Sequence, residues 1–390
     1  MPRSLIPPLN FWDVSLTLTG LALVVGLIFP LSLAASIPVF GLCLYSAYCF
    51  SFKTSPPLAK SLALWLIMLL ALMGLSSLWS INPDESFNRF IKTTPLVVTS
   101  YLFYITIRQC PYENFTKFKN FFLCAILVIG SLICIELNFF VIKTHDNLYI
   151  AASNLNKNSA LFMLLIPCCF YLLHRTNKLY LIAFTALTIA LFISTESQSS
   201  QLAGLVMIAT SIGMLPFLRT VTKFIIITGL IALAILMPFI STILFDLVET
   251  QKAETSIVPL TGLTRLENWD FIAREIFKSP WYGHGMDATR YMNFTTEQLF
   301  FKDTTIVHPH NGFLQIWIET GISGALLMVL GLGLYAARKT NILHFVIFTG
   351  ASTILLLSWS IWSAWLIASL FFIAGFSALA VTGRNAPRQP

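Results

Sequence analysis

The chain consists of apolar runs long enough to cross a lipid bilayer, separated by short polar connectors. A helix that crosses a hydrocarbon core of ~30 Å needs roughly 20 mostly apolar residues. Within lipid the backbone polar groups must be bonded inside each segment, so we expect helices. We identify twelve candidate spans: Val14–Phe29, Leu31–Phe50, Leu58–Trp79, Pro95–Ile107, Phe121–Val141, Ala160–Leu173, Leu179–Ser194, Leu202–Phe217, Phe224–Phe245, Phe313–Ala337, Ile342–Trp359 and Ile361–Ala380.

The composition supports the same fold class. Of the 390 residues 56% are hydrophobic and only 11% are charged, whereas soluble domains carry about 25% charged residues. This excludes a soluble enzyme, a disordered protein and a coiled coil. We therefore predict an all-α integral membrane protein with about 12 transmembrane helices. All seven cysteines lie in or beside apolar runs, so buried thiols are expected rather than a disulfide framework.

The lysines and arginines of the short connectors indicate the orientation in the membrane. With a cytoplasmic N-terminus, only Arg89, Lys92, Lys143 and Lys157 lie outside in short segments. Fourteen lie inside: Arg3, Lys53, Lys60, Arg108, Lys117, Lys119, Arg175, Lys178, Arg219, Lys223, Arg338, Lys339, Arg384 and Arg388. We expect both termini in the cytoplasm, and a retained first span rather than a cleaved signal peptide.

One long polar connector, residues 246–312, interrupts the apolar pattern. It divides the chain into helices over 1–245, an outer loop over 246–312, and helices with a tail over 313–390. Connectors of this length are usually functional or disordered. Within the loop, Gly262–Ser279 predicts an amphipathic helix with Thr264 as its N-cap and Glu267 as the capping-box partner. Its apolar face carries Leu266, Trp269, Ile272 or Ala273, and Ile276.

The loop contains a turn and then returns into the next span. The run Trp281–Gly285 is predicted to be a turn with aromatic anchors at the membrane interface. Asn311, Gln315 and Glu319 are spaced four apart and share one helix face. A carboxylate at the depth of Glu319 is costly and normally faces the bundle interior. It either pairs with a polar group of a neighbouring helix or lines a substrate cavity.

Further polar patches are predicted to open to the same outer side as the loop. All of them interrupt or border the apolar pattern, and together they predict one outward-facing, partly charged cavity at the membrane surface. The patches are Ser194–Gln201, Asn82–Glu85, Asn88–Lys92 and Asn154–Asn158.

The loop is poorly suited to binding a metal. His284, His308 and His310 lie near Asp287, Asp303 and Glu319. The His308-Pro309-His310 spacing does not put two ligands on one helix face, however, and no cysteine is near. No acidic pair is present for a magnesium–diphosphate clamp. We therefore expect no metal; arginines would neutralise a diphosphate, because their planar fork suits phosphate oxygens.

Three motifs carry a family resemblance: Arg265-x3-Trp269, Pro280-x2-Gly283-x-Gly285, and the run from His308-Pro309-His310-Asn311 through Gln315 to Glu319-x-Gly321-x2-Gly324. This chain resembles the O-antigen ligase/polymerase superfamily, and the loop between spans nine and ten fits its layout. The resemblance implies a metal-independent, GT-C-like, inverting glycosyltransferase without a cofactor in the bacterial inner membrane, with its active site facing the periplasm. The partners it implies are undecaprenyl-diphosphate-linked polysaccharide as donor and lipid A–core as acceptor.

The resemblance also assigns roles to residues. The loop arginine of the family corresponds to Arg265, which would stabilise the leaving diphosphate. Its histidine corresponds to His310, which would act as general base, a role suited to a histidine near its unperturbed pKa. Where the family has an arginine after span seven, this chain has Gln198; either Gln198 serves more weakly, or Arg89 or Lys92 supplies the cation. Gln315 or Glu319 would orient the imidazole beside Asn311.

Two enzymes of the same superfamily fit the sequence equally well, and a transporter fits it less closely. An O-antigen polymerase and a protein O-oligosaccharyltransferase of the same superfamily share the donor and differ only in the acceptor. A transporter or flippase often shows repeats and broken helices near the midplane, and neither is apparent. Polar residues concentrated at one surface favour chemistry at that surface.

Overall fold

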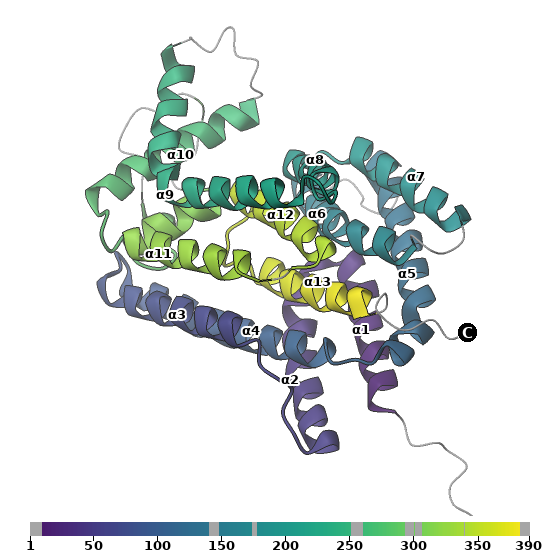
Figure 1. Cartoon of the computed structure of the whole chain (residues 1–390). Helices are drawn as coiled ribbons and strands as arrows, with labels where there is room; N and C mark the ends of the chain where they lie inside the picture. The colour runs from purple at the N-terminus through teal and green to yellow at the C-terminus, as the bar shows by residue number, and fades with distance from the viewer. Residues whose placement is uncertain are drawn as a thin grey trace, which may run out of the picture.

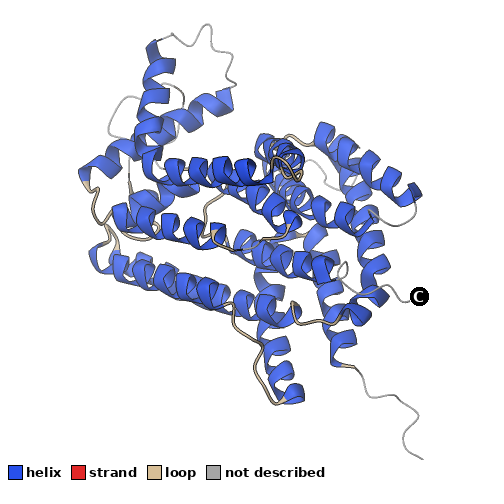
Figure 2. Ribbon diagram, viewed as in Figure 1, coloured by secondary structure: helices blue, strands red, loops and turns tan. Residues whose placement is uncertain are grey.

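The structure, a computed structural model, describes residues 10–139, 148–173, 178–250, 260–292, 300, 306–338 and 340–382. All regular structure in these ranges is helical (Figure 2). The α-helices are α1 Phe11–Ile28, α2 Leu33–Phe52, α3 Lys60–Ser76, α4 Pro83–Ile107, α5 Tyr112–Phe139, α6 Leu148–Leu173, α7 Lys178–Ser194, α8 Gln198–Gly213, α9 Arg219–Thr250, α10 Leu260–Lys278, α11 Gly312–Ala336, α12 Ile342–Leu357 and α13 Ala364–Thr382. Short 3₁₀ turns are η1 Pro30–Ser32, η2 Ser77–Trp79 and η4 Ala288–Tyr291.

The predicted fold class is confirmed: the chain is an all-α, multi-pass membrane protein. Each of the twelve predicted runs falls on a helix, and α10 is the additional helix of the loop. Within the described ranges, nine helices are long and apolar enough to cross a membrane. The other three runs form the shorter helices α7, α8 and α12, of 17, 16 and 16 residues. All seven cysteines are unpaired.

Helices α9, α11, α12 and α13 lie side by side, with α3 and α4 along the flank of α11 and α13 (Figure 1). Helix α10 packs against α9, whose end extends beyond the rest of the bundle (Figure 1). The largest apolar cluster joins α1, α2, α4, α5, α6 and α13, while a second cluster joins α9, α10 and α11. The loop helix is therefore anchored to the bundle through its own core.

Two expected outer connectors are helical instead. Helix α4 begins at Pro83 and carries Arg89 and Lys92, and α6 begins at Leu148, before Asn154–Asn158. The start of α4 has a local cause: Asn82 accepts a hydrogen bond from the Glu85 N–H, and Pro83 takes the first helical position. Lys143, Arg175, Lys339 and the termini used in the charge count lie outside the described residues.

Helix α10 confirms the predicted apolar face and corrects the predicted start. Trp269, Ile272 and Ile276 are buried in the α9–α10–α11 cluster. The helix begins at Leu260, so Thr264 lies inside it and is not the N-cap. The Glu267 carboxylate accepts the Phe300 N–H at 2.9 Å instead of closing a capping box, because the returning loop lies against this helix.

The expected single span Phe313–Ala337 is broken at Gly321. This residue has φ 62° and ψ −151°, which no helix contains. A Cβ on Gly324 would lie 2.6 Å from Ile316 Cγ2, although eight residues of a straight helix rise about 12 Å. The second segment of α11 therefore folds back beside the first, Gly312–Thr320, and a left-handed backbone of this kind favours glycine.

Candidate active site

The glycine-rich loop after α10 fills the break in α11. The His284 N–H donates to the Ile318 carbonyl at 2.7 Å, and the Gly285 N–H to the Glu319 carbonyl at 2.9 Å. In return the Ile322 N–H donates to the Pro280 carbonyl at 2.9 Å. These bonds satisfy backbone groups that the break leaves without helical partners. The Pro280-x2-Gly283-x-Gly285 motif thus has a structural role at this position.

The segment before α11 is fixed from two sides. The Trp269 indole N–H of α10 donates to the Pro309 carbonyl at 2.8 Å. The Asn311 side chain caps α11 by accepting the Phe313 and Leu314 N–H groups at 3.0 and 3.1 Å. Between these anchors His310 adopts φ 53°, a left-handed conformation that is uncommon outside glycine. Such conformations persist where the surroundings enforce them, and they cluster at functional sites.

The rings of His308 and His310 lie against each other, with centroids 4.1 Å apart. The His310 backbone N–H donates to His308 Nδ1 at 3.3 Å. A neutral His308 therefore carries its proton on Nε2 and presents a donor there. The His310 ring is hydrogen-bonded to the Ser358 backbone, and this bond favours its protonated form, so the ring N–H donates to the carbonyl. Its second nitrogen remains available as an acceptor.

Burial and nearby cations shift both histidines away from their usual pKa of 6.5. Burial lowers the pKa of His310 to about 4, with a further contribution from the Arg265 charge. Burial lowers the pKa of His308 to about 3, with His310, Arg290 and Arg89 adding to the shift. The expectation of an unperturbed histidine was wrong, because the loop and the helix ends enclose both rings. The charge of Arg265 acts on His310, and the charges of Arg290 and Arg89 act on His308, so cations lie near both rings.

Arg265 has no carboxylate partner within the described ranges. It is half-buried on α10, and burial lowers the pKa of its guanidinium. The nearby acids are engaged elsewhere: Asp270 binds Arg274 at 2.7 Å, and Glu267 accepts the Phe300 N–H. A half-buried cation without a counterion attracts an anion strongly, since few water molecules screen it.

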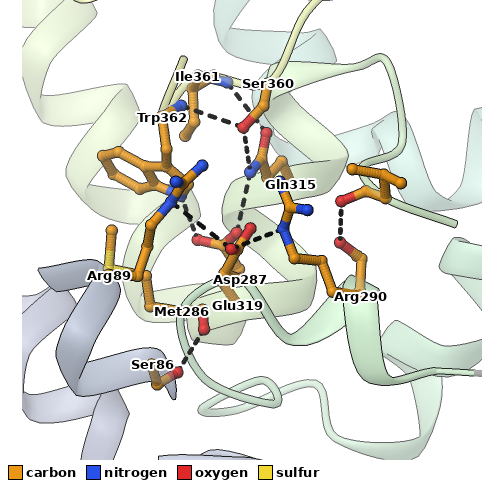
Figure 3. Close-up of polar contacts among 12 residues, drawn as sticks. Ser86, Arg89, Met286, Asp287, Arg290, Gln315, Glu319, Ser360, Ile361 and Trp362 are labelled. Atoms are coloured by element: carbon orange, nitrogen blue, oxygen red, sulfur yellow. Dashed lines mark hydrogen bonds and ion pairs between the residues drawn. The ribbon is translucent and has the colours of Figure 1, made fainter. Parts of the chain in front are cut away.

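A second cationic group forms where α4 meets the loop (Figure 3). The Asp287 carboxylate lies 2.8 Å from Arg290 Nε and 3.5 Å from Arg89 Nε. One carboxylate faces two arginines, so the group keeps a net positive charge. Sequence reasoning included Arg89 and missed Arg290; the i,i+3 spacing from Asp287 was the only local signal.

Beside these arginines a buried network holds the connector between α12 and α13, residues 358–363 (Figure 3). Gln315 Nε2 donates to Glu319 Oε1 at 3.0 Å and to Ser360 Oγ at 2.9 Å. The Trp362 indole donates to Glu319 Oε2 at 2.6 Å, and the Ile361 N–H to Gln315 Oε1 at 3.0 Å. Both side chains thus bind the connector that carries Ser358, whereas the predicted direct contact with the His310 ring is not among the described hydrogen bonds.

The start of α8 reaches the same connector, since Ser199 Oγ donates to Ser358 Oγ at 3.1 Å. Gln198 itself is exposed, and its side chain forms no hydrogen bond within the described part of the chain. Lys92 is likewise exposed on α4. The structure therefore groups Arg265, Arg89, His310, Asn311, Gln315 and Glu319 around one site and leaves Gln198 at its edge without a contact. Among the described residues, no three His, Cys, Asp or Glu side chains are grouped to hold a metal; Asp303 lies outside this set.

Comparisons with known proteins agree with the family resemblance. The sequence pattern of the family described as "O-Antigen ligase" matches residues 181–329, from α7 into α11. A protein of Rickettsia bellii named "Putative polysaccharide ligase" is 24% identical over 327 residues, covering 77% of this chain and 75% of the relative. A Rickettsia typhi protein of the same description is 25% identical over 337 residues, covering 81% and 80%. No solved structure matches the chain significantly. The chain resembles the O-antigen ligase superfamily.

Proposed function

We propose that this protein is a membrane glycosyltransferase of the polysaccharide ligase type, which transfers a polysaccharide from undecaprenyl diphosphate to a sugar hydroxyl of lipid A–core. The observation that carries the proposal is the pair of neutral histidines near Arg265 and the Arg89–Asp287–Arg290 group, whose charges lower their pKa values. A base near two cationic groups suits displacement of an anionic leaving group by a hydroxyl. The likeness to the superfamily supports the same class of reaction.

The donor's diphosphate would bind to the arginines. Arg265 has no carboxylate partner among the described residues, and Arg89 with Arg290 retains net positive charge after Asp287 is counted. An apolar cavity of about 280 Å³ begins beside the site at Gly312 and Ile361 and continues between α3, α11 and α12. A cavity with this lining suits the polyprenyl chain of the carrier lipid. Transfer of the apolar chain from a polar environment to apolar walls is favourable.

In the chemical step the acceptor hydroxyl oxygen attacks the anomeric carbon of the donor sugar, and the bond from that carbon to the diphosphate oxygen breaks. The free ring nitrogen of His310 accepts the hydroxyl proton, while the bond to Ser358 holds the ring in place. The arginines stabilise the charge that develops on the leaving diphosphate. A bound anionic donor also offsets the Arg265 charge, so it raises the pKa of His310 and makes the base stronger when the site is loaded.

The polar connectors fit a site buried within the protein near one membrane face. Helices α8 and α12 have 16 residues each, or about 24 Å, which is shorter than a ~30 Å hydrocarbon core. Irregular backbone at such depth is tolerated only inside protein or beside a cavity. The charge bias of the connectors supports a periplasmic location of this face in the inner membrane, and of the loop 246–312.

Deleting the gene tests the acceptor. Loss of a ligase leaves free lipid A–core while polymer accumulates on the carrier lipid; loss of a polymerase instead leaves core capped with one repeat unit. Purified protein supplied with carrier-linked polymer should remain active in EDTA, and loss of activity that Mg²⁺ restores would contradict the arginine mechanism. Phosphatase fusions at Gln251 and Arg388 test the orientation: activity at Arg388 would invert the proposed topology.

A further inference from the structure

A second cavity lies at the C-terminal end of α11. It measures about 210 Å³ and lies between the start of α9, the end of α11 and the start of α12. Lys223 and Thr340 supply its polar groups, and Phe224, Tyr335 and Phe345 are among its apolar walls. In the topology that the connector charges predict, most connector lysines and arginines are located at this end of the bundle.

The cations at this cavity have uncharged partners among the described residues. Lys223 Nζ donates to Thr340 Oγ1 at 3.0 Å, and Arg219 Nη2 donates to the Thr340 carbonyl at 3.1 Å. Both partners are uncharged, and Lys223 and Arg219 repel each other. No carboxylate of the described residues forms an ion pair with either of them or with Arg338, which lines the neighbouring apolar cavity. Two cations that converge on one threonine without a counterion favour a bound anion.

The walls indicate what kind of anion fits. Lys223 Nζ lies 5.6 Å from the centre of the Phe345 ring, and Phe224 beside it is 70% exposed on the outer surface of the bundle. In a multi-pass protein an exposed phenylalanine at this position faces lipid. The cavity therefore has cations at one side, apolar walls at the other and a neighbouring bilayer, which excludes the full hydration that a free phosphate ion requires.

We propose that this cavity binds the headgroup phosphate of an anionic phospholipid. Lys223 and Arg219 contact the phosphate, and the adjoining acyl segment lies against Phe224 and Phe345. Basic pockets between transmembrane helices bind anionic lipid headgroups by this combination of charge and apolar contact. The bound lipid joins α9 to the α11–α12 connection, and so stabilises the bundle independently of the donor.

The test uses purified full-length protein in neutral detergent, with mixed micelles that contain phosphatidylglycerol or phosphatidylcholine. Native mass spectrometry measures bound lipid, and thermal unfolding measures stabilisation. We expect wild type to retain phosphatidylglycerol selectively and to unfold at higher temperature with it. The variant Lys223→Gln/Arg219→Gln should bind it about thirtyfold more weakly, which corresponds to about 1 kcal/mol for each cation.

Matched variants separate the cavity from general attraction. Lys60→Gln/Lys178→Gln removes two exposed cations on other connectors and should leave binding unchanged. Thr228→Trp keeps both cations but fills the cavity, so it should abolish selective retention of phosphatidylglycerol. Lys223→Arg keeps the charge and is the control for an effect of substitution at this position on folding. Equal phosphatidylglycerol binding by wild type and Lys223→Gln/Arg219→Gln, or unchanged binding by Thr228→Trp, would overturn the proposal. Complete displacement of the lipid by excess inorganic phosphate would also overturn it, in favour of a site for a soluble anion.

Discussion

His310 donates its backbone N–H to Nδ1 of His308 at 3.3 Å, and this single bond gives the two histidines different chemistry. It occupies the basic nitrogen of His308 and leaves that ring a donor. His310 donates from its own ring to the Ser358 backbone and keeps one free basic nitrogen. The left-handed backbone of His310 brings its amide to the neighbouring ring.

The two histidines should therefore respond unequally to substitution. We expect His310→Ala to reduce transfer by ~10²–10⁴-fold, the usual contribution of a general base, and His308→Ala to cause a much smaller loss. His308→Asn should be close to wild type, because an amide oxygen can replace Nδ1 as the acceptor. Ligation in cells that lack the native gene, with expression checked in membranes, measures this. Near-normal ligation by His310→Ala beside an inactive His308→Ala would show that the wrong histidine is assigned.

Arg265 should not be replaceable by lysine. Lys keeps the charge but loses the planar fork that binds two phosphate oxygens, so we expect Arg265→Lys to lose most transfer and Arg265→Ala to bind donor weakly. Arg274→Lys is the matched control, since Arg274 lies on the same helix and is paired with Asp270 and Asp246. Donor binding and single-turnover transfer with carrier-linked polymer distinguish the variants. If Arg265→Lys and Arg274→Lys behave alike, Arg265 does not contact the diphosphate.

Arg290 should matter more than Gln198. Arg290 forms an ion pair with Asp287 beside Arg89, whereas the Gln198 side chain forms no hydrogen bond within the described part of the chain. We expect Arg290→Gln to raise the KM for the donor about tenfold or more, the effect of losing about 1.4 kcal/mol of charge-assisted binding. Gln198→Ala should change it less than twofold. Steady-state kinetics over a range of donor concentrations tests both. A larger effect of Gln198→Ala than of Arg290→Gln would indicate that the donor binds at the start of α8.

The acid limb of kcat/KM should lie near pH 4 rather than near pH 6.5. Only neutral His310 accepts a proton, and burial with the Arg265 charge lowers its pKa to about 4. Activity should therefore persist as the pH falls through 6 and 5 and decline only as it approaches 4. In Arg265→Gln the acid limb of the residual activity should move to a higher pH. Without the repelling charge of Arg265, the pKa of His310 is higher. A wild-type limb at pH 6.5 would mean that the base is exposed to solvent.

Gly321→Ala should damage the site from a distance. Gly321 has φ 62°, and a Cβ there would lie 2.5 Å from the Trp281 carbonyl carbon. The backbone strain alone costs about 1–3 kcal/mol, and the loop with Asp287 and Arg290 would shift. Gly333→Ala is the control, since a Cβ at Gly333 meets no atom within 4 Å. Thermal unfolding and ligation should fall only for Gly321→Ala; equal behaviour would show that the loop does not depend on the break.

The sequence alone determined the fold class and predicted several residues of the candidate site. Long runs of apolar residues predict where the helices lie, because in lipid the backbone N–H and C=O groups must form hydrogen bonds within each segment. The motif around His310 and the position of Arg265 could also be identified, since both depend on residues close together in the chain. The N-cap at Asn82 also depends only on neighbouring residues. The sequence therefore contained the signal for a helix start there, and the prediction of an outer connector was wrong.

Only the tertiary structure decided how these parts meet. The break at Gly321 places the second half of α11 beside the first, and no apolar pattern distinguishes such a fold-back from one continuous span. Arg89 and Asp287 are nearly 200 positions apart, and Ser358 reaches His310 from another helix pair. Contacts of this kind arise from the packing of helices and loops, which local periodicity does not encode. The low pKa of His310 follows from the same enclosure, because burial and the Arg265 charge exist only once the chain has folded.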